Sequence, residues 1–139
     1  MLEVTVQDTR KGGGERLIAD QVIYADTPAL RRKGLLGLQT LDPAEGALLV
    51  IRCTARGLVP PRLGLSLFHS IHMFGVPFEL AAAWLDDEGT ILDVKRARPG
   101  RMVFPSGIFT KARYILEVHP AHLPLLQKRH RIRWREGDP

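Results

Sequence analysis

The chain has 139 residues, of which 45% are hydrophobic, and it carries a formal net charge of +5 at pH 7. This length accommodates one hydrophobic core and excludes two domains of ordinary size, so we expect a single domain over residues 1–139. Apolar runs are far shorter than the roughly 20 residues of a membrane-spanning helix, and the N-terminus lacks an apolar secretory core, which predicts a soluble cytoplasmic protein without a membrane partner.

The first third of the chain predicts strands joined by short turns. Residues 2–7 and 16–24 have the composition of strands and flank a turn at 11–15 that contains three consecutive glycines. Residues 47–52 are almost continuously apolar, which indicates a short buried strand after the turn at 41–46.

A short helix is predicted within residues 26–37. Thr27 suits the N-cap, and Pro28 suits the first helical position because proline fixes φ and loses no needed donor there. Gly34 or Gly37 marks the end of the helix. Its inward side is expected to consist of leucines, namely Leu30, Leu35 and Leu36.

The rest of the chain predicts more short strands, separated by turns rich in glycine and proline. The expected strands are 65–72, 78–86, 90–97, 112–118 and 131–135. A loop is expected at 53–64, a hairpin turn at 86–89, and a short helix or helical turn at 120–130. Many short strands with one or two short helices predict a mainly β fold, either a single-domain β sandwich or a partly closed barrel.

The order of several motifs resembles a known prokaryotic family. These motifs are ADTPALRRKGLLG at 25–37, SIHMFGVPFEL at 70–80, RPGR at 98–101 and ARYILEV at 112–118. Over about 22–137 the chain resembles the domain of unknown function 192 family, also called uncharacterised protein family 0127. The resemblance implies a compact β-rich fold similar to a jelly-roll sandwich, and it implies no activity.

The central motif departs from the family pattern at two points. In one branch of the family, Ser-Ile-His-Thr-Phe-Gly is followed by Pro-Ile-Asp, whereas this chain has Glu79 in place of the aspartate. The stretch between Gly75 and Pro77 is also shorter here.

The segment FHSIHMFGVPFEL at 68–80 holds the most suggestive polar side chains. In a strand, His69 and His72 point to opposite faces, so no shared metal site is predicted. A bend at 75–77 would bring Glu79 toward His72, where the carboxylate either orients the imidazole as a general base or forms a structural hydrogen bond.

Our favoured hypothesis is a β domain that binds a small polar or anionic ligand. The candidate pocket comprises His72, Glu79, Arg101 and Glu117. Arginine suits carboxylate or phosphate groups, and Glu117 lies in the apolar context ILEVH. A buried carboxylate is costly unless it is paired, so Arg113 or Arg101 is the expected partner of Glu117.

Two alternative functions remain open from the sequence. A hydrolase or isomerase would use His72 as the base and Glu79 to orient it. A nucleic-acid or acidic-partner binder would use a basic C-terminal strand, in which Arg131, Arg133 and Arg135 share one face. The same arginines also suit an edge strand that is protected from pairing with other chains. A second basic cluster is formed by Arg31, Arg32 and Lys33.

The strongest enzyme signatures are absent from the sequence. It contains no nucleophile elbow, zinc-peptidase motif or phosphate loop. Cys53 is the only cysteine, so the chain cannot form an internal disulfide, and a small buried residue is its expected role. The sequence identifies no cofactor, no oligomeric state, and no reaction.

Overall fold

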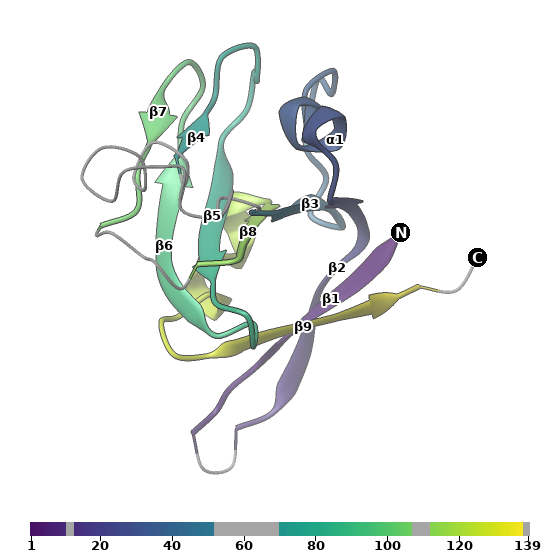
Figure 1. Ribbon diagram of the computed structural model, residues 1–139. Helices are drawn as coiled ribbons and strands as arrows, with labels where there is room; N and C mark the ends of the chain where they lie inside the picture. Colours follow the sequence, from purple (N-terminus) through teal and green to yellow (C-terminus); the bar gives the residue numbers. More distant parts are fainter. Residues whose placement is uncertain (11–12, 52–69, 107–111, 138–139) are drawn as a thin grey trace.

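The computed structural model describes residues 1–10, 13–51, 70–106 and 112–137 (Figure 1). The fold is mainly β, as the sequence predicted. The strands are β1 (Leu2–Gln7), β2 (Glu15–Ala25), β3 (Glu45–Val50), β4 (Ile71–His72), β5 (Leu80–Leu85), β6 (Ile91–Ala97), β7 (Met102–Val103), β8 (Tyr114–Val118) and β9 (Arg131–Glu136). The helical elements are α1 (Pro28–Lys33) and the 3₁₀ helix η2 (Pro120–Leu125). None of the described helices is long and apolar enough to cross a bilayer.

Seven strands form one sheet in the order β6-β5-β8-β3-β2-β1-β9. Neighbouring strands are antiparallel except β2 and β3, which are parallel because the chain crosses over between them through α1. The short strands β4 and β7 pair separately, with Ile71 opposite Val103. In Figure 1, α1 and the β4–β7 pair both lie at the upper ends of the large sheet.

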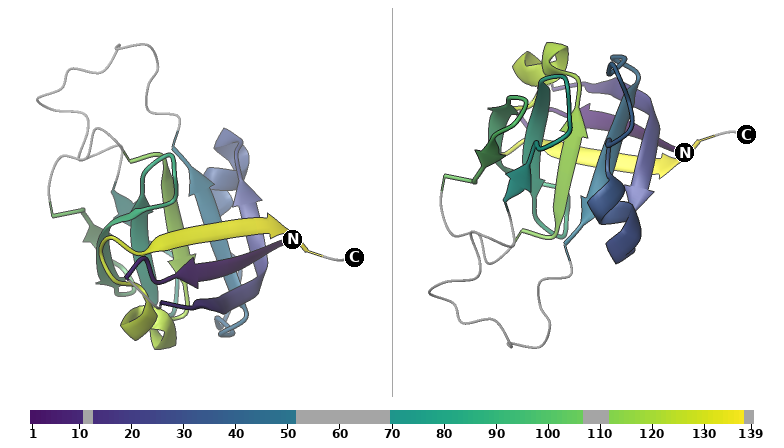
Figure 2. Two further views of the ribbon diagram at one scale, coloured as in Figure 1. Left: turned by 90° about the horizontal axis from the view of Figure 1, so that it is seen from below. Right: turned by 90° about the horizontal axis from the view of Figure 1, so that it is seen from above.

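The large sheet curls so that its two edge strands meet at one end (Figure 2). The backbone N–H of Ile91 donates to the carbonyl of His130 at 2.8 Å, and an isolated bridge joins Thr90 to Arg131. No continuous ladder joins the described strands β6 and β9 beyond this short contact, so the sheet does not close into a barrel. The arrangement is consistent with a β sandwich.

Strand β5, with the sequence LAAAWL, is buried on both faces. Ala81, Ala83 and Leu85 face a core enclosed by the curled sheet. The alternate residues, including Trp84, face a second core that also contains Leu35 and Met73. The second core also includes Ile71 of β4 and Leu35, which follows α1, so β4 and the segment after α1 cover the central strands on this side.

Helix α1 confirms the predicted capping pattern. The hydroxyl oxygen of Thr27 accepts a hydrogen bond from the backbone N–H of Leu30 at 3.1 Å, and Gly34 ends the helix with φ of +45°. The predicted inward side was wrong for Leu30, which is 37% exposed. Because α1 ends at Lys33, the leucines that contact the second core, Leu35 and Leu36, follow the helix instead of lying on it.

The hairpin turn at 86–89 is also confirmed. The Asp86 N–H donates to the carbonyl of Thr90, and Gly89 adopts φ of +85°. The expected helical turn is present as η2. The loop at 53–64, Cys53 and His69 lie outside the described residues.

The close approach of β3 and β8 at Gly46 gives a direct test of this packing. A Cβ atom at Gly46 would lie 2.6 Å from the backbone oxygen of Glu117 and 2.9 Å from Cγ1 of Val118. Gly46→Ala should therefore lower the free energy of unfolding in urea by about 1–3 kcal/mol, because a backbone oxygen cannot shift cheaply. The control is Gly14→Ala, where nothing lies within 4 Å of the added atom. Equal stabilities of the two variants would contradict the described packing.

Candidate anion-binding cavity

A cavity of about 90 Å³ lies between the end of α1, strand β4 and the second-core face of the sheet. Most of its lining is apolar. Its polar side chains are Arg31, Arg32, Lys33, Ser70, His72 and Glu117. Arg32, Lys33 and His72 are exposed, so these residues mark the side on which the cavity meets solvent.

Glu117 reaches the cavity because of its position in β8. Its neighbours Leu116 and Val118 belong to the enclosed core, so strand alternation directs Glu117 to the opposite face. The residues directly across from it are Ala47 in β3 and Ala82 in β5. These small side chains leave space above the sheet, and Glu117 is only 5% exposed.

The Glu117 carboxyl group has no hydrogen-bonding or ion-pairing partner among the described residues. It lies beneath the end of α1, since a Cβ atom built on Gly34 would be 3.5 Å from its Oε1 atom. Burial raises the pKa of Glu117 from 4.5 to about 7, because removal from water disfavours the ionised form.

The last turn of α1 supplies three cationic side chains to the same cavity. Arg31 is half-buried, and its Nη1 atom donates to the carbonyl of Asp26 at 3.2 Å. Neither Arg31, Arg32 nor Lys33 forms an ion pair with Glu117, although all four side chains line the cavity. Glu117 is the only acidic residue in the described lining, so the lining is positively charged.

His72 lies on the exposed side of the cavity. Its ring stacks on Phe74, with the ring centroids 5.8 Å apart. Ser70, which precedes β4, also lines the cavity. These two residues and the α1 cluster come from segments far from Glu117 in the sequence.

The structure brings together two of the four residues predicted to form a pocket. His72 and Glu117 line the same cavity, whereas Glu79 does not. The Glu79 carboxylate pairs with Arg96 at 3.2 Å and with Arg98 at 3.6 Å. The register of β5 and β6 explains this pairing, because Leu80 lies opposite Ala97 and so directs Glu79 toward these arginines. No hydrogen bond or ion pair joins Glu79 to His72 in the described structure.

The expected arginine partners of Glu117 also lie elsewhere. Arg101 is exposed, and its backbone carbonyl accepts a hydrogen bond from Met73. Arg113 directs Nη1 to the carbonyl of Ala112 at 3.1 Å. Among the described contacts neither arginine pairs with Glu117. A structural ion pair therefore does not explain the burial of the Glu117 carboxyl group.

A histidine–carboxylate pair does exist, at a place that the sequence analysis did not single out. Nε2 of His130 lies 3.3 Å from Oδ1 of Asp8. Hydrogen bonds from Arg10 hold the pKa of Asp8 below its usual range. Nothing in the local sequence signals this pair, because strand pairing alone brings the two segments together.

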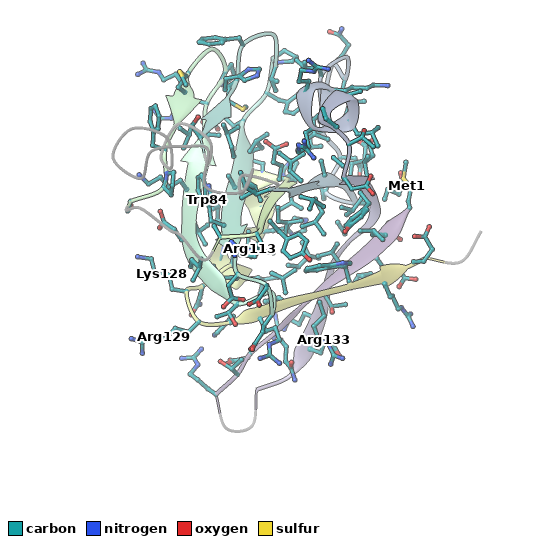
Figure 3. All side chains as sticks on the ribbon, in the orientation of Figure 1. Met1, Trp84, Arg113, Lys128, Arg129 and Arg133 are labelled. Atoms are coloured by element: carbon teal, nitrogen blue, oxygen red, sulfur yellow. The ribbon has the colours of Figure 1, made fainter. Side chains whose placement is uncertain are left out.

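The C-terminal arginines lie on an edge strand, because β9 ends the sheet. Arg131 pairs with Glu88 and Arg135 with Glu3, each at 3.2 Å. Figure 3 shows Lys128, Arg129 and Arg133 along the lower edge of the molecule, away from α1.

The described residues contain no group of three or more acidic, histidine or cysteine side chains that could hold a metal ion.

Comparison with known proteins identifies a family and a shared fold. The model of the domain of unknown function 192 family, described as "Uncharacterized ACR", matches residues 8–124. No curated protein matches the chain.

Two solved structures are similar over nearly the whole chain. One is a "putative transcription regulator" from Sinorhizobium meliloti 1021, with a TM-score of 0.69 and 17% identity, covering 96% of this chain and 94% of that one. The other is a protein of unknown function from Novosphingobium aromaticivorans DSM 12444, with a TM-score of 0.68 and 17% identity. The match covers 95% of this chain and 84% of that one. At these identities the likeness concerns the fold alone.

The raised pKa of Glu117 predicts a specific pH dependence of stability. The native state binds this proton more tightly than the unfolded state, so stability should fall as pH rises from 4.5 through about 7. The full loss is about 3 kcal/mol. In Glu117→Gln the loss should disappear, so the variant gains stability relative to the wild-type protein across this range. Urea unfolding at a series of pH values measures the difference, and parallel curves for the two proteins would contradict it.

Proposed function

This chain belongs to the domain of unknown function 192 family, and we propose that it acts as a binding domain for a small ligand that carries an anionic group. The family designation names no activity, so the proposal rests on the cavity itself. We assign no reaction to the site, because the expected general-base pair of His72 and Glu79 is not formed among the described contacts.

One observation carries the proposal, namely that three cationic side chains and a buried carboxyl group line one cavity without pairing with each other. Arg31, Arg32 and Lys33 give the cavity a positive potential that favours an anion. Arginine side chains present several donors that suit carboxylate and phosphate oxygens. A ligand between the cations and Glu117 would supply contacts that the protein does not make by itself.

The size of the cavity limits what can enter. Its volume of about 90 Å³ is several times the roughly 10–15 Å³ that one water requires. It is well below the roughly 300–1,000 Å³ of ordinary small-molecule sites. The proposed ligand is therefore either a small anion or the anionic end of a larger molecule whose remainder extends past His72 into solvent.

The basic edge strand offers a different function, which the same experiment can separate. Nucleic-acid binding would use Arg131, Arg133 and Arg135, and one structural neighbour is described as a "putative transcription regulator". Two of these three arginines, however, already pair with Glu88 and Glu3. We therefore favour the cavity, where the cations make no ion pair among the described residues.

Binding of acetate and inorganic phosphate to matched charge variants tests the proposal. The triple variant R31Q/R32Q/K33Q should raise the Kd of both anions at least about tenfold, because it removes the cations of the cavity. The control R131Q/R133Q/R135Q removes the same charge from β9 and should leave both Kd values unchanged. Calorimetric titration and thermal unfolding with each anion give the two readouts, and circular dichroism verifies that both variants are folded.

Two results would reject the proposal. One is that neither anion binds the wild-type protein or raises its unfolding temperature. The other is that the two triple variants weaken binding equally, which would assign it to the overall net charge. If a short oligonucleotide binds and only the β9 variant abolishes that binding, the edge strand is the functional surface instead.

A further inference from the structure

We infer that the ligand anion binds together with a proton, and that Glu117 in its neutral form donates a hydrogen bond to that anion. This inference rests on the proposed function, because it concerns the same cavity. It makes Glu117 a hydrogen-bond donor to the ligand and requires the ligand to supply an acceptor. It also predicts that a proton is taken up from solvent when the ligand binds.

The surroundings of Glu117 suit a neutral acid. An ionised carboxylate in a buried site requires several donors, and the described protein provides none to this one. Its cross-strand neighbours Ala47 and Ala82 carry no polar groups. A neutral carboxyl group needs one acceptor for its O–H, and an anion in the cavity supplies that acceptor.

Among the described residues, the cationic and imidazole groups that line the cavity with Glu117 come from two elements. The end of α1 contributes Arg31, Arg32 and Lys33, and β4 contributes His72. Strands β3 and β5 contribute apolar lining, namely Leu49 and Leu80. Burial alone raises the pKa of Glu117, and the cations of the lining do not lower it.

An incoming anion shifts the protonation equilibrium of Glu117 further toward the neutral acid. It places a like charge beside Glu117, and a like charge disfavours the carboxylate. When Glu117 is ionised in the empty protein, one proton is therefore taken from solvent to a carboxyl oxygen as the anion binds. No covalent bond of the ligand forms or breaks.

The inference also separates two classes of small ligand. A simple anion such as acetate needs Glu117 as a donor. A zwitterion such as glycine would instead place its ammonium group against Glu117 and would require the carboxylate, so its binding would release a proton. The positive lining disfavours that ammonium group, and we therefore expect acetate to bind more tightly than glycine.

The test is the pH dependence of acetate binding to the wild-type protein, measured by NMR chemical-shift titration between about pH 6 and 9. Acetate remains an anion throughout this range. If binding requires the neutral acid, its Kd should rise by about tenfold per pH unit above the pKa of Glu117 and should level off below it. Glu117→Gln should bind acetate with a Kd that is nearly independent of pH, because its amide N–H donates without titrating.

A second variant separates the effect of Glu117 from that of the His72 imidazole, which also lines the cavity. His72→Asn removes the imidazole and should retain the steep rise in Kd at high pH. Acetate binding to the wild-type protein with a pH-independent Kd would overturn the inference and leave the proposed function intact. Tighter binding of glycine than of acetate would also overturn it. If acetate does not bind at any pH, the proposed function itself fails.

Discussion

The burial of one carboxyl group without a partner is the constraint on which this account depends. Desolvation of a carboxylate is costly unless donors replace the lost water, and the described residues give none to Glu117. An apolar side chain at this position would join the second core at no such cost. Glu117 therefore lowers the stability of the protein at neutral pH. We assign ligand binding as the function of this side chain.

Small residues in the neighbouring strands position Glu117. Gly46 lets β3 approach β8 beside Glu117, and Ala47 and Ala82 leave space above the carboxyl group. Gly34 then ends α1 over the same point, which brings the basic last turn of the helix to the cavity. Sheet packing and the electrostatics of the site are thus set by the same contacts.

Local patterns predicted most of the secondary structure and little of the site. The cap at Thr27, the stop at Gly34 and the turn at Gly89 depend on backbone chemistry that neighbouring residues determine. The exposure of Leu30 depends on how α1 packs, whereas the pairing of Glu79 with Arg96 and the convergence of α1 on Glu117 depend on strand order and register. No local pattern encodes these tertiary features, and the motif resemblance was informative about the fold but not about the ligand.

The most direct test of the central claim is the titration of Glu117 itself in the ligand-free protein. Carbon-13 NMR of side-chain carboxyl groups, with Glu117→Gln to assign the resonance, reports its pKa without reference to stability or binding. The account predicts a midpoint at about 7, well above the ordinary value of 4.5. A midpoint near the ordinary value would mean that water or a protein donor reaches the carboxylate, and it would contradict the account.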